Sequence, residues 1–268
     1  MIRLALRVRR ADAEAVLAEL LELVPGGVEE REIGETIEYA IYGAAGELPE
    51  LPELEAVAGG ALVDITTGHV SDGWAEEWKQ FHAPALVGDR LWIRPPWEPL
   101  REDPGLLDVV IDPGQAFGTG AHHTTRLCLE LMLGLRAQGP FADLGCGSGV
   151  LAIAAAKLGF DPVMAVDHDP ASVEATRANA TANGVNVDVL QADLRDEPRV
   201  APTSAANLRR PLLLEVAPAL GEPPPRRLIA SGLLRGEAGE VSGAFAKHGL
   251  LEKERHSAGE WTALLLAG

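Results

Sequence analysis

Residues 141–149 read Phe-Ala-Asp-Leu-Gly-Cys-Gly-Ser-Gly, and residues 150–157 read Val-Leu-Ala-Ile-Ala-Ala-Ala-Lys. The short apolar run before the glycines predicts a buried strand, and the alanine-rich run after them predicts a helix. Glycines at a strand-to-helix turn let a ligand lie against the main chain, where the first N–H groups of the helix point at it. The stretch therefore predicts a site for a nucleotide-like ligand, although a purely structural turn would use the same glycines.

The spacing of the glycines narrows the choice of ligand. A dinucleotide site has the pattern Gly-x-Gly-x-x-Gly, but Val150 stands where the third glycine of that pattern would fall. The sequence instead has Gly-x-Gly-x-Gly, in which Asp143 precedes Gly145 and Gly147. A carboxylate there can meet an ammonium group or order water near it. The pattern favours the amino-acid end of S-adenosylmethionine over a nicotinamide cofactor.

Two further acidic residues follow strand signals. Asp167 ends the next apolar run and could accept two hydrogen bonds from ribose hydroxyls. Its alternative role is a helix cap, but Asp169-Pro170 already provides a cap and a first-turn proline. Asp193 follows the third strand signal, where it could reach an adenine amino group or cap its own loop.

Strand and helix signals alternate from about residue 106 to the C-terminus. Strands are expected near 108–111, 141–144, 162–166, 187–190, 227–230, 250–254 and 261–266. Helices are expected near 124–135, 150–158, 170–183, 211–220 and 237–248. This alternation predicts an α/β fold with a doubly wound, Rossmann-like, mainly parallel sheet that carries helices on both faces.

Asn207 falls where the fourth strand of this sheet should end. Ligands bind at that edge of such sheets, so Asn207 could hydrogen-bond a substrate amine or the cofactor. The preceding segment, 196–206, contains two prolines and a single β-branched apolar residue. We therefore expect the fourth strand to be weak or irregular.

The first 70 residues have a pattern of their own. The signals are an alternating strand at 2–8, a helical stripe at 13–24, strands at 28–33 and 37–42, a short helix at 52–58 and a strand at 61–66. This order predicts a small ferredoxin-like α+β domain. Trp74, Trp78 and Phe81 are spaced by four and three, which predicts a linker helix with an aromatic packing face.

These patterns predict three parts of the chain: a substrate-recognition domain, a linker with its connecting segment, and a catalytic domain. Their predicted bounds are 1–68, 69–104 and 105–268.

Composition and charge restrict the class of partner. Of the 268 residues, 47% are hydrophobic and 24% are charged, which is an ordinary globular balance, and the net charge is −17. A nucleic-acid backbone is therefore not expected as a direct partner, because it requires basic patches. Residues 1–70 contain 5 Lys+Arg and 14 Asp+Glu, a net charge of −9. This acidity either attracts a basic partner or belongs to a solvated face.

Other features concern localisation and metals. Cys128 and Cys146 suit reduced thiols in a cytoplasmic enzyme better than a disulfide framework. We see no signal peptide and no apolar run of membrane-spanning length, so we expect a cytoplasmic protein without a membrane partner, and a monomer. His122 and His123 are adjacent and no Cys or acidic residue completes a ligand set, so no metal site is expected.

Together these motifs resemble the PrmA family, the methyltransferases of the large-subunit ribosomal protein L-eleven. Matching stretches begin near residue 70 and comprise 72–79, 112–114, 117–120, 122, 124–125, 143–149, 167–170, 206–208, 231–234 and 259–261. The glycine motif is shared by many methyltransferases. The Phe-Gly-Thr-Gly loop at 117–120, combined with the tryptophan-rich linker, is much more specific.

The resemblance implies a small N-terminal domain that recognises the basic ribosomal protein, a linker and a catalytic domain. It implies S-adenosylmethionine-dependent methylation of lysine side chains, and of an N-terminal amine, on the free protein. By position, the implied cofactor contacts include Thr125, Gly145, Asp167 and Asn207. Phe117 and Thr119 would lie near the cofactor or the substrate entrance. Asn207 is also our candidate for orienting the substrate amine, and we find no dedicated base.

Two alternatives remain open at the level of sequence. One is the same chemistry on another protein's lysines or on a small molecule, although the acidic N-terminal domain favours a protein substrate. The other is a cofactor-binding module with weakened catalysis, which the irregular segment before Asn207 suggests.

Overall fold

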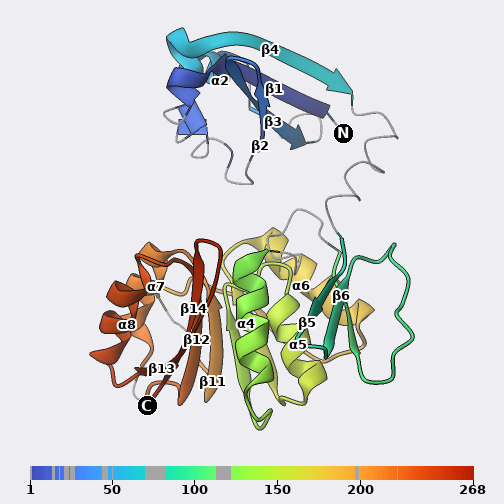
Figure 1. Cartoon of the computed structure of the whole chain (residues 1–268), viewed down its shortest axis with the longest axis vertical. Coiled ribbons are helices and arrows are strands. Elements are labelled where there is room, and N and C mark those ends of the chain that lie inside the picture. The colour runs from blue at the N-terminus through green and yellow to red at the C-terminus, as the bar shows by residue number, and fades with distance from the viewer. Residues whose placement is uncertain are drawn as a thin grey trace. The chain divides into compact units, whose positions relative to one another are not determined.

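The computed structural model describes residues 2–13, 16–17, 19–20, 24, 28–43, 48–49, 51–69, 83–112, 122–196, 199–221 and 223–268. The chain divides into two compact units, Met1–Phe81 and His82–Gly268 (Figure 1). The three aromatic residues of the expected linker helix, Trp74, Trp78 and Phe81, lie outside the described residues. In the described part of the chain, no helix is both long and apolar enough to cross a membrane.

The first unit contains one antiparallel sheet with the strand order β2-β3-β1-β4. The strands are β1 (Ile2–Arg9), β2 (Glu29–Ile33), β3 (Thr36–Gly43) and β4 (Leu62–His69). The helical elements are η1 (Arg10–Asp12), α2 (Leu51–Ala58) and η2 (Gly59–Ala61), and the described residues from 13 to 20 are helical too. This order, with β1 and β3 in the middle, is ferredoxin-like, so the α+β prediction is confirmed.

Alternation along β1 gives this unit its own core. Leu4, Leu6 and Val8 are buried on one face of the sheet, because successive strand residues point to opposite sides. They pack with Leu20 and Leu54, both of which lie in helical segments. Full burial of each such side chain stabilises the folded state by roughly 1.5–3 kcal/mol.

The second unit is built on a seven-stranded sheet with the order β10-β9-β8-β11-β12-β14-β13. The strands are β8 (Phe141–Leu144), β9 (Val163–Asp167), β10 (Asp188–Gln191), β11 (Thr203–Asn207), β12 (Arg227–Leu234), β13 (Leu251–Ala258) and β14 (Trp261–Ala267). Strands β10, β9, β8, β11 and β12 are mutually parallel, whereas β14 is antiparallel to both of its neighbours. From β8 the chain proceeds outward through β9 and β10, and it then returns to β11 on the other side of β8. The point between β8 and β11, where the winding reverses, is where open α/β sheets bind ligands.

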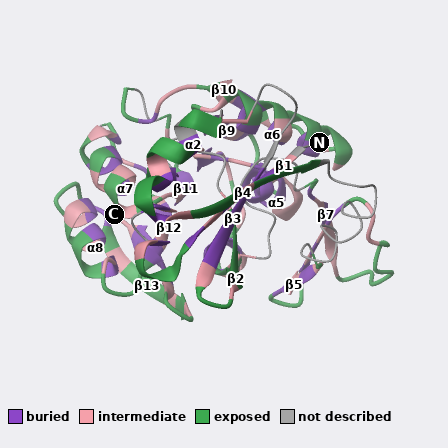
Figure 2. Ribbon diagram, turned by 90° about the horizontal axis from the view of Figure 1, so that it is seen from above, coloured by how far each residue is buried: buried purple, intermediate pink, exposed green. Residues whose placement is uncertain are grey.

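Helices cover both faces of this sheet, which confirms the doubly wound prediction. They are α4 (His123–Leu133), α5 (Val150–Leu158), α6 (Pro170–Ala182), α7 (Arg210–Val216), η3 (Ala217–Ala219) and α8 (Ala238–Ala246). Buried residues of α4, α5 and α6 belong to one core cluster, and those of α7 and α8 belong to a second. Figure 1 shows α7 and α8 on one side of the sheet and α4 on the other. Figure 2 shows the buried residues gathered along the strands between these layers.

The expectation of a weak fourth strand is wrong. Strand β11 pairs in parallel with β8 on one side and β12 on the other, and its first four residues are buried. Both prolines of the segment precede the strand, so neither removes a donor from the ladder. The small residues Ser204, Ala205 and Ala206 fit between helices that cover both faces, and pairing on both edges overrides their low strand propensity. The Ser204 hydroxyl is satisfied locally, because it donates to the Ala201 carbonyl (3.0 Å).

The strand expected near 108–111 exists, but it does not join the main sheet. It is β7 (Leu107–Val110), which pairs in parallel with β6 (Leu91–Arg94) in a three-stranded sheet completed by β5 (Ala85–Val87). The Arg94 guanidinium donates to both carboxylate oxygens of Asp108 (2.8 and 2.9 Å), which fixes this pairing. The apolar residues of this sheet share a core cluster with α5, so the second unit extends upstream of residue 105.

Candidate functional site

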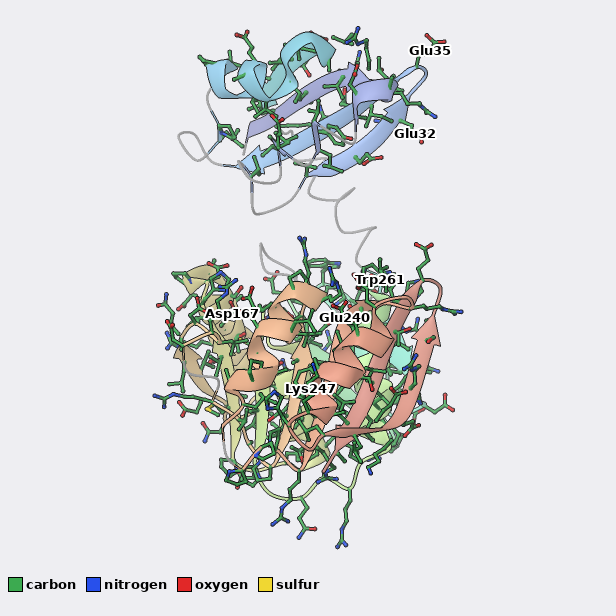
Figure 3. The ribbon with its side chains drawn as sticks, turned by 90° about the vertical axis from the view of Figure 1, so that its left-hand side faces the viewer. Glu32, Glu35, Asp167, Glu240, Lys247 and Trp261 are labelled. Carbon is green, nitrogen blue, oxygen red and sulfur yellow. The ribbon has the colours of Figure 1, made fainter. Side chains whose placement is uncertain are left out.

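Three neighbouring parallel strands deliver the central site residues to one edge of the sheet. Gly145 follows β8, Asp167 is the last residue of β9, and Asn207 is the last residue of β11. Because β9, β8 and β11 are adjacent and parallel, their carboxyl ends meet at the point where the winding reverses. Figure 3 shows Asp167 at this end of the second unit, together with Trp261 at the start of β14.

The glycine loop, residues 145–149, is held by backbone contacts to β9. The Gly145 and Cys146 N–H groups both donate to the Val166 carbonyl (2.8 and 3.0 Å), and the Gly147 N–H donates to Asp167 Oδ2 (2.9 Å). Gly145 has a φ of 76°, and a Cβ there would lie 2.3 Å from the Leu208 Cδ2 atom. The positive φ and the close approach of Leu208 both disfavour a side chain at position 145, which explains this glycine on structural grounds.

Asp167 has acceptor capacity left for a ligand. The residue is 7% exposed, and its two carboxylate oxygens accept the N–H groups of Gly147 (2.9 Å) and Asp169 (3.0 Å). The exposed His168 ring also lies near, with its Nδ1 atom 3.3 Å from Oδ1. An ionised carboxylate has about four acceptor sites, so acceptor capacity remains for ribose hydroxyls. The capping role belongs to Asp169, which accepts the Ala171 N–H at the start of α6 (3.0 Å), as the sequence predicted.

Asn207 is anchored on the first turn of α4. Its Nδ2 atom donates to the hydroxyls of Thr124 (3.3 Å) and Thr125 (3.4 Å), both of which are buried. His122 caps this helix, because its Nδ1 atom accepts the Thr124 N–H (3.3 Å). Ser231 on β12 donates to the Thr124 carbonyl (3.2 Å). These contacts fix the Asn207 amide through its Nδ2 atom. The Oδ1 atom of the same amide accepts no hydrogen bond from the described residues.

Asp193 takes the loop-capping role that the sequence left open. Its Oδ1 accepts the Arg195 N–H (2.9 Å), and its Oδ2 pairs with the Arg195 guanidinium (3.2 Å), which also binds Glu215 (2.7 Å). The Arg195 N–H, followed by its guanidinium, lowers the pKa of the Asp193 carboxyl, so the group is charged at neutral pH. A contact from Asp193 to adenine stays a prediction.

Asp143 lies beneath the glycine loop, with 1% of its surface exposed. Its Oδ2 accepts the Ala152 N–H of α5 (3.1 Å), and its Oδ1 has no hydrogen-bond partner in the described part of the chain. Burial raises the pKa of this carboxyl to about 7, and the charge of nearby Asp167 adds to the effect. A direct contact between Asp143 and a ligand ammonium group stays a prediction.

The raised pKa of Asp143 gives a pH-dependent stability. The folded chain holds this proton more tightly than the unfolded chain, so the contribution is fully present below about pH 4 and is lost as the pH rises through about 7. Relative to the parent, Asp143→Asn should therefore gain stability between about pH 4 and pH 7, by at most about 4 kcal/mol. Thermal unfolding without ligand measures this difference, with exposed Asp161→Asn as control. An Asp143→Asn difference that does not change with pH would contradict the assignment.

Gly232 lies in one of the stretches that match the family, but the sequence assigned it no role, and the structure shows that it limits the position of Leu208. Its φ is 85°, and an added Cβ would lie 2.3 Å from the Leu208 carbonyl oxygen. The Leu208 N–H in turn donates to the Ser231 carbonyl (3.0 Å), so β12 sets the direction of the chain just after Asn207. Close approach between segments distant in sequence leaves no local signal.

Gly232→Ala is expected to destabilise the second unit by about 1–3 kcal/mol, because backbone atoms cannot yield as a flexible side chain can. That loss should lower Tm by roughly 2–10 °C. Gly249→Ala is the matched control, since Gly249 has a φ of 83° and an added Cβ there meets nothing within 4 Å. Equal melting temperatures for the two variants would show that the close approach has no energetic effect.

Two predicted residues, Phe117 and Thr119, lie outside the described residues, so their proximity to a ligand stays a prediction. The structure does bring together Thr125, Gly145, Gly147, Asp167 and Asn207 at one edge, through the contacts given above. Their roles as cofactor contacts stay predictions.

Comparisons with known proteins agree with this geometry. The family model described as ribosomal protein L11 methyltransferase (PrmA) matches residues 48–267. The ribosomal protein L11 methyltransferase of Geobacter metallireducens is 41% identical over 203 residues, which cover 75% of this chain and 68% of that protein. That of Pelotomaculum thermopropionicum is 41% identical over 225 residues, which cover 80% of this chain and 73% of that protein.

A solved structure gives the same result for the fold. The crystal structure of ribosomal protein L11 methylase from Lactobacillus delbrueckii subsp. bulgaricus superimposes with a TM-score of 0.62 and 29% identity, covering 69% of this chain and 97% of that chain. The extent of the family match and the identity to these relatives confirm the resemblance drawn from the motifs. The chain belongs to the ribosomal protein L11 methyltransferase (PrmA) family.

Proposed function

We propose that this chain transfers methyl groups from S-adenosylmethionine to lysine side chains, and to an N-terminal amine, of ribosomal protein L11. The observation that carries the proposal is the meeting of the glycine loop, Asp167 and Asn207 at one sheet edge, in a chain whose family consists of L11 methyltransferases. Membership of that family makes the chain a methyltransferase. The cofactor, the substrate and the roles of single residues are the proposed part.

The residues at the site suit the parts of S-adenosylmethionine. The glycine loop, which lies between β8 and the N-terminus of α5, suits the amino-acid end, and the spare acceptor capacity of Asp167 suits ribose hydroxyls. The unpartnered oxygen of Asp143 provides a buried acceptor and partial negative charge close to where a cation would lie. Thr125 completes the set of proposed contacts that the described residues offer, and Phe117 and Thr119 are proposed from sequence alone.

The chemistry requires position more than proton transfer. The cofactor supplies a methyl group already activated on a sulfonium. A lysine, with an ordinary pKa of about 10.4, must first lose its proton, and desolvation in the site favours the neutral amine. The Asn207 Oδ1 can then accept one amine N–H and so direct the nitrogen lone pair along the line of transfer.

The first unit is the proposed site of protein recognition. Strand β2 is an exposed edge, and its residues Glu29, Glu30 and Glu32 are exposed. Glu32 and Glu35 extend this surface around the β2–β3 turn (Figure 3). Glu32 pairs with the Arg10 guanidinium and Arg31 is exposed on the same strand, but the acidic residues outnumber these two arginines. A negative surface of this kind attracts a basic ribosomal protein. The proposal is for a cytoplasmic monomer with no direct nucleic-acid contact, in keeping with a net charge of −17.

The alternatives now have less support. The module with weakened catalysis was suggested by an irregular fourth strand, but β11 is regular and paired on both sides. Other proteins or small molecules as substrates have no observation in their favour. Incubation of the chain with labelled S-adenosylmethionine and an extract from cells that lack this enzyme tests the substrate. The label is expected on a single ribosomal protein of the large subunit, whereas label on other proteins or small molecules would overturn the assignment.

A further inference from the structure

We propose that Asn179 is a positioning residue, which fixes the glycine loop and the end of the β7 segment relative to each other. The inference rests on the proposed function, because it assigns this fixed geometry to the cofactor site. Asn179 lies near the C-terminal end of α6 and is 3% exposed. A buried amide is costly unless its donors and acceptor are satisfied, and Asn is not a strong helix former. Its presence there calls for partners outside the helix.

Those partners are backbone groups of two separate segments. The Asn179 Nδ2 donates to the Ser148 carbonyl in the glycine loop (2.9 Å). Its Oδ1 accepts the Asp112 N–H (3.0 Å), and its Nδ2 also lies 3.4 Å from the Asp112 carbonyl oxygen. One side chain therefore joins two segments that lie far apart in the sequence.

Asn183, one helical turn further on, forms a similar arrangement with β7. Its Oδ1 accepts the Val110 N–H (2.9 Å), and its Nδ2 donates to the Val110 carbonyl (2.6 Å). Four residues of helix rise about 6 Å, and two residues of strand about 6.6 Å. Amides at positions i and i+4 of α6 can therefore pair with Val110 and Asp112 as a neighbouring strand would. The two asparagines together complete the free edge of β7.

Of the two asparagines, only Asn179 also contacts the glycine loop. A role in positioning that loop can therefore be distinguished from a role in stability alone by comparing the two residues. The segment that contains Phe117 and Thr119 begins one residue after Asp112. By holding Asp112 and Ser148 at once, Asn179 sets the distance between Asp112 and the proposed cofactor loop. Asn183 holds β7 without any hydrogen bond to the loop.

Asn179→Ala and Asn183→Ala form a matched pair for the test. Both should lower Tm, because each leaves backbone groups without a partner. Only Asn179→Ala should raise the dissociation constant and the KM for S-adenosylmethionine, by about tenfold (about 1.4 kcal/mol), with little change in the KM for the ribosomal protein. Equal changes in cofactor affinity for the two variants, or none in either, would overturn the inference.

Amide hydrogen exchange keeps the test independent of the proposed function. Asn179→Ala should speed exchange at Asp112 and in the glycine loop, whereas Asn183→Ala should speed it at Val110 and leave the loop unchanged. If the parent chain bound no S-adenosylmethionine, the proposed function would fail while the exchange rates would still decide the role of Asn179. An unchanged glycine loop in Asn179→Ala would refute it.

If the Asn179→Ala variant folds poorly, Asn179→Asp tests the contact to Ser148 instead. The aspartate keeps the acceptor for the Asp112 N–H, but an ionised carboxylate repels the Ser148 carbonyl. Protonation restores a donor, so cofactor affinity of this variant should recover as the pH falls, with no such recovery in the parent. Weak binding that stayed weak at every pH, in a folded variant, would count against the proposed contact to Ser148.

Discussion

Asp167→Asn is expected to raise the dissociation constant for S-adenosylmethionine by at least about 100-fold, or about 2.7 kcal/mol. The substitution removes the charge that strengthens hydrogen bonds from ribose hydroxyls. It also turns one oxygen into an NH₂ group. That group would face either the Gly147 N–H or the Asp169 N–H, where an acceptor is needed. The ligand contact and the loop that supports it should therefore weaken together.

The natural control for Asp167→Asn lies two residues away. Asp169 caps α6, and Asn caps helices about as well as Asp, so Asp169→Asn should leave cofactor affinity and stability almost unchanged. Isothermal titration with S-adenosylmethionine measures both variants. Native affinity in a folded Asp167→Asn variant would show that the ribose does not bind at this carboxylate.

Asn207→Ala is expected to lower kcat by about 100-fold, because loss of the orienting amide lets the amine leave the line of transfer. Its effect on the dissociation constant for the cofactor should be smaller. The amide is held by the Thr124 and Thr125 hydroxyls, so the position of Oδ1 is set by the first turn of α4. Single-turnover methyl transfer, measured beside cofactor titration, separates the two effects.

Thr124→Val provides a graded comparison for Asn207→Ala. Valine keeps the buried volume but removes the hydroxyl that accepts from Asn207. The amide then keeps only its hydrogen bond to the Thr125 hydroxyl. We expect a smaller loss of kcat than in Asn207→Ala, with cofactor affinity close to that of the parent. Transfer at the native rate in Asn207→Ala would contradict the orienting role.

Much of the architecture could be predicted because its signals are local. Periodicity over 141–158 defines β8 and α5 directly, and the alternation that follows defines the remaining strands and helices of the doubly wound sheet. Strand pairing is not local, which is why β7 was assigned to the wrong sheet. The strength of β11 was underestimated for the same reason, since its neighbours β8 and β12 supply what its small residues lack.

In the site too, features with a local signal could be predicted and features that depend on distant segments could not. Asp167 and Asn207 could be predicted because residues that end adjacent parallel strands must meet at one sheet edge. Gly232 and Asn179 could not, because the first is required by an approach to Leu208 and the second by backbone groups of distant segments. An asparagine on a helix ordinarily indicates a solvated face, so the sequence alone gave no reason to expect it in the core.

The most direct test of the central claim uses purified components. Unmodified ribosomal protein L11 is incubated with this chain and S-adenosylmethionine, and its peptides are then analysed by mass spectrometry. We expect added methyl groups on lysine side chains or the N-terminal amine of L11, and none when Asn207→Ala replaces the parent for the same short time. Unmodified L11 after incubation with a parent chain that demonstrably binds S-adenosylmethionine would contradict it.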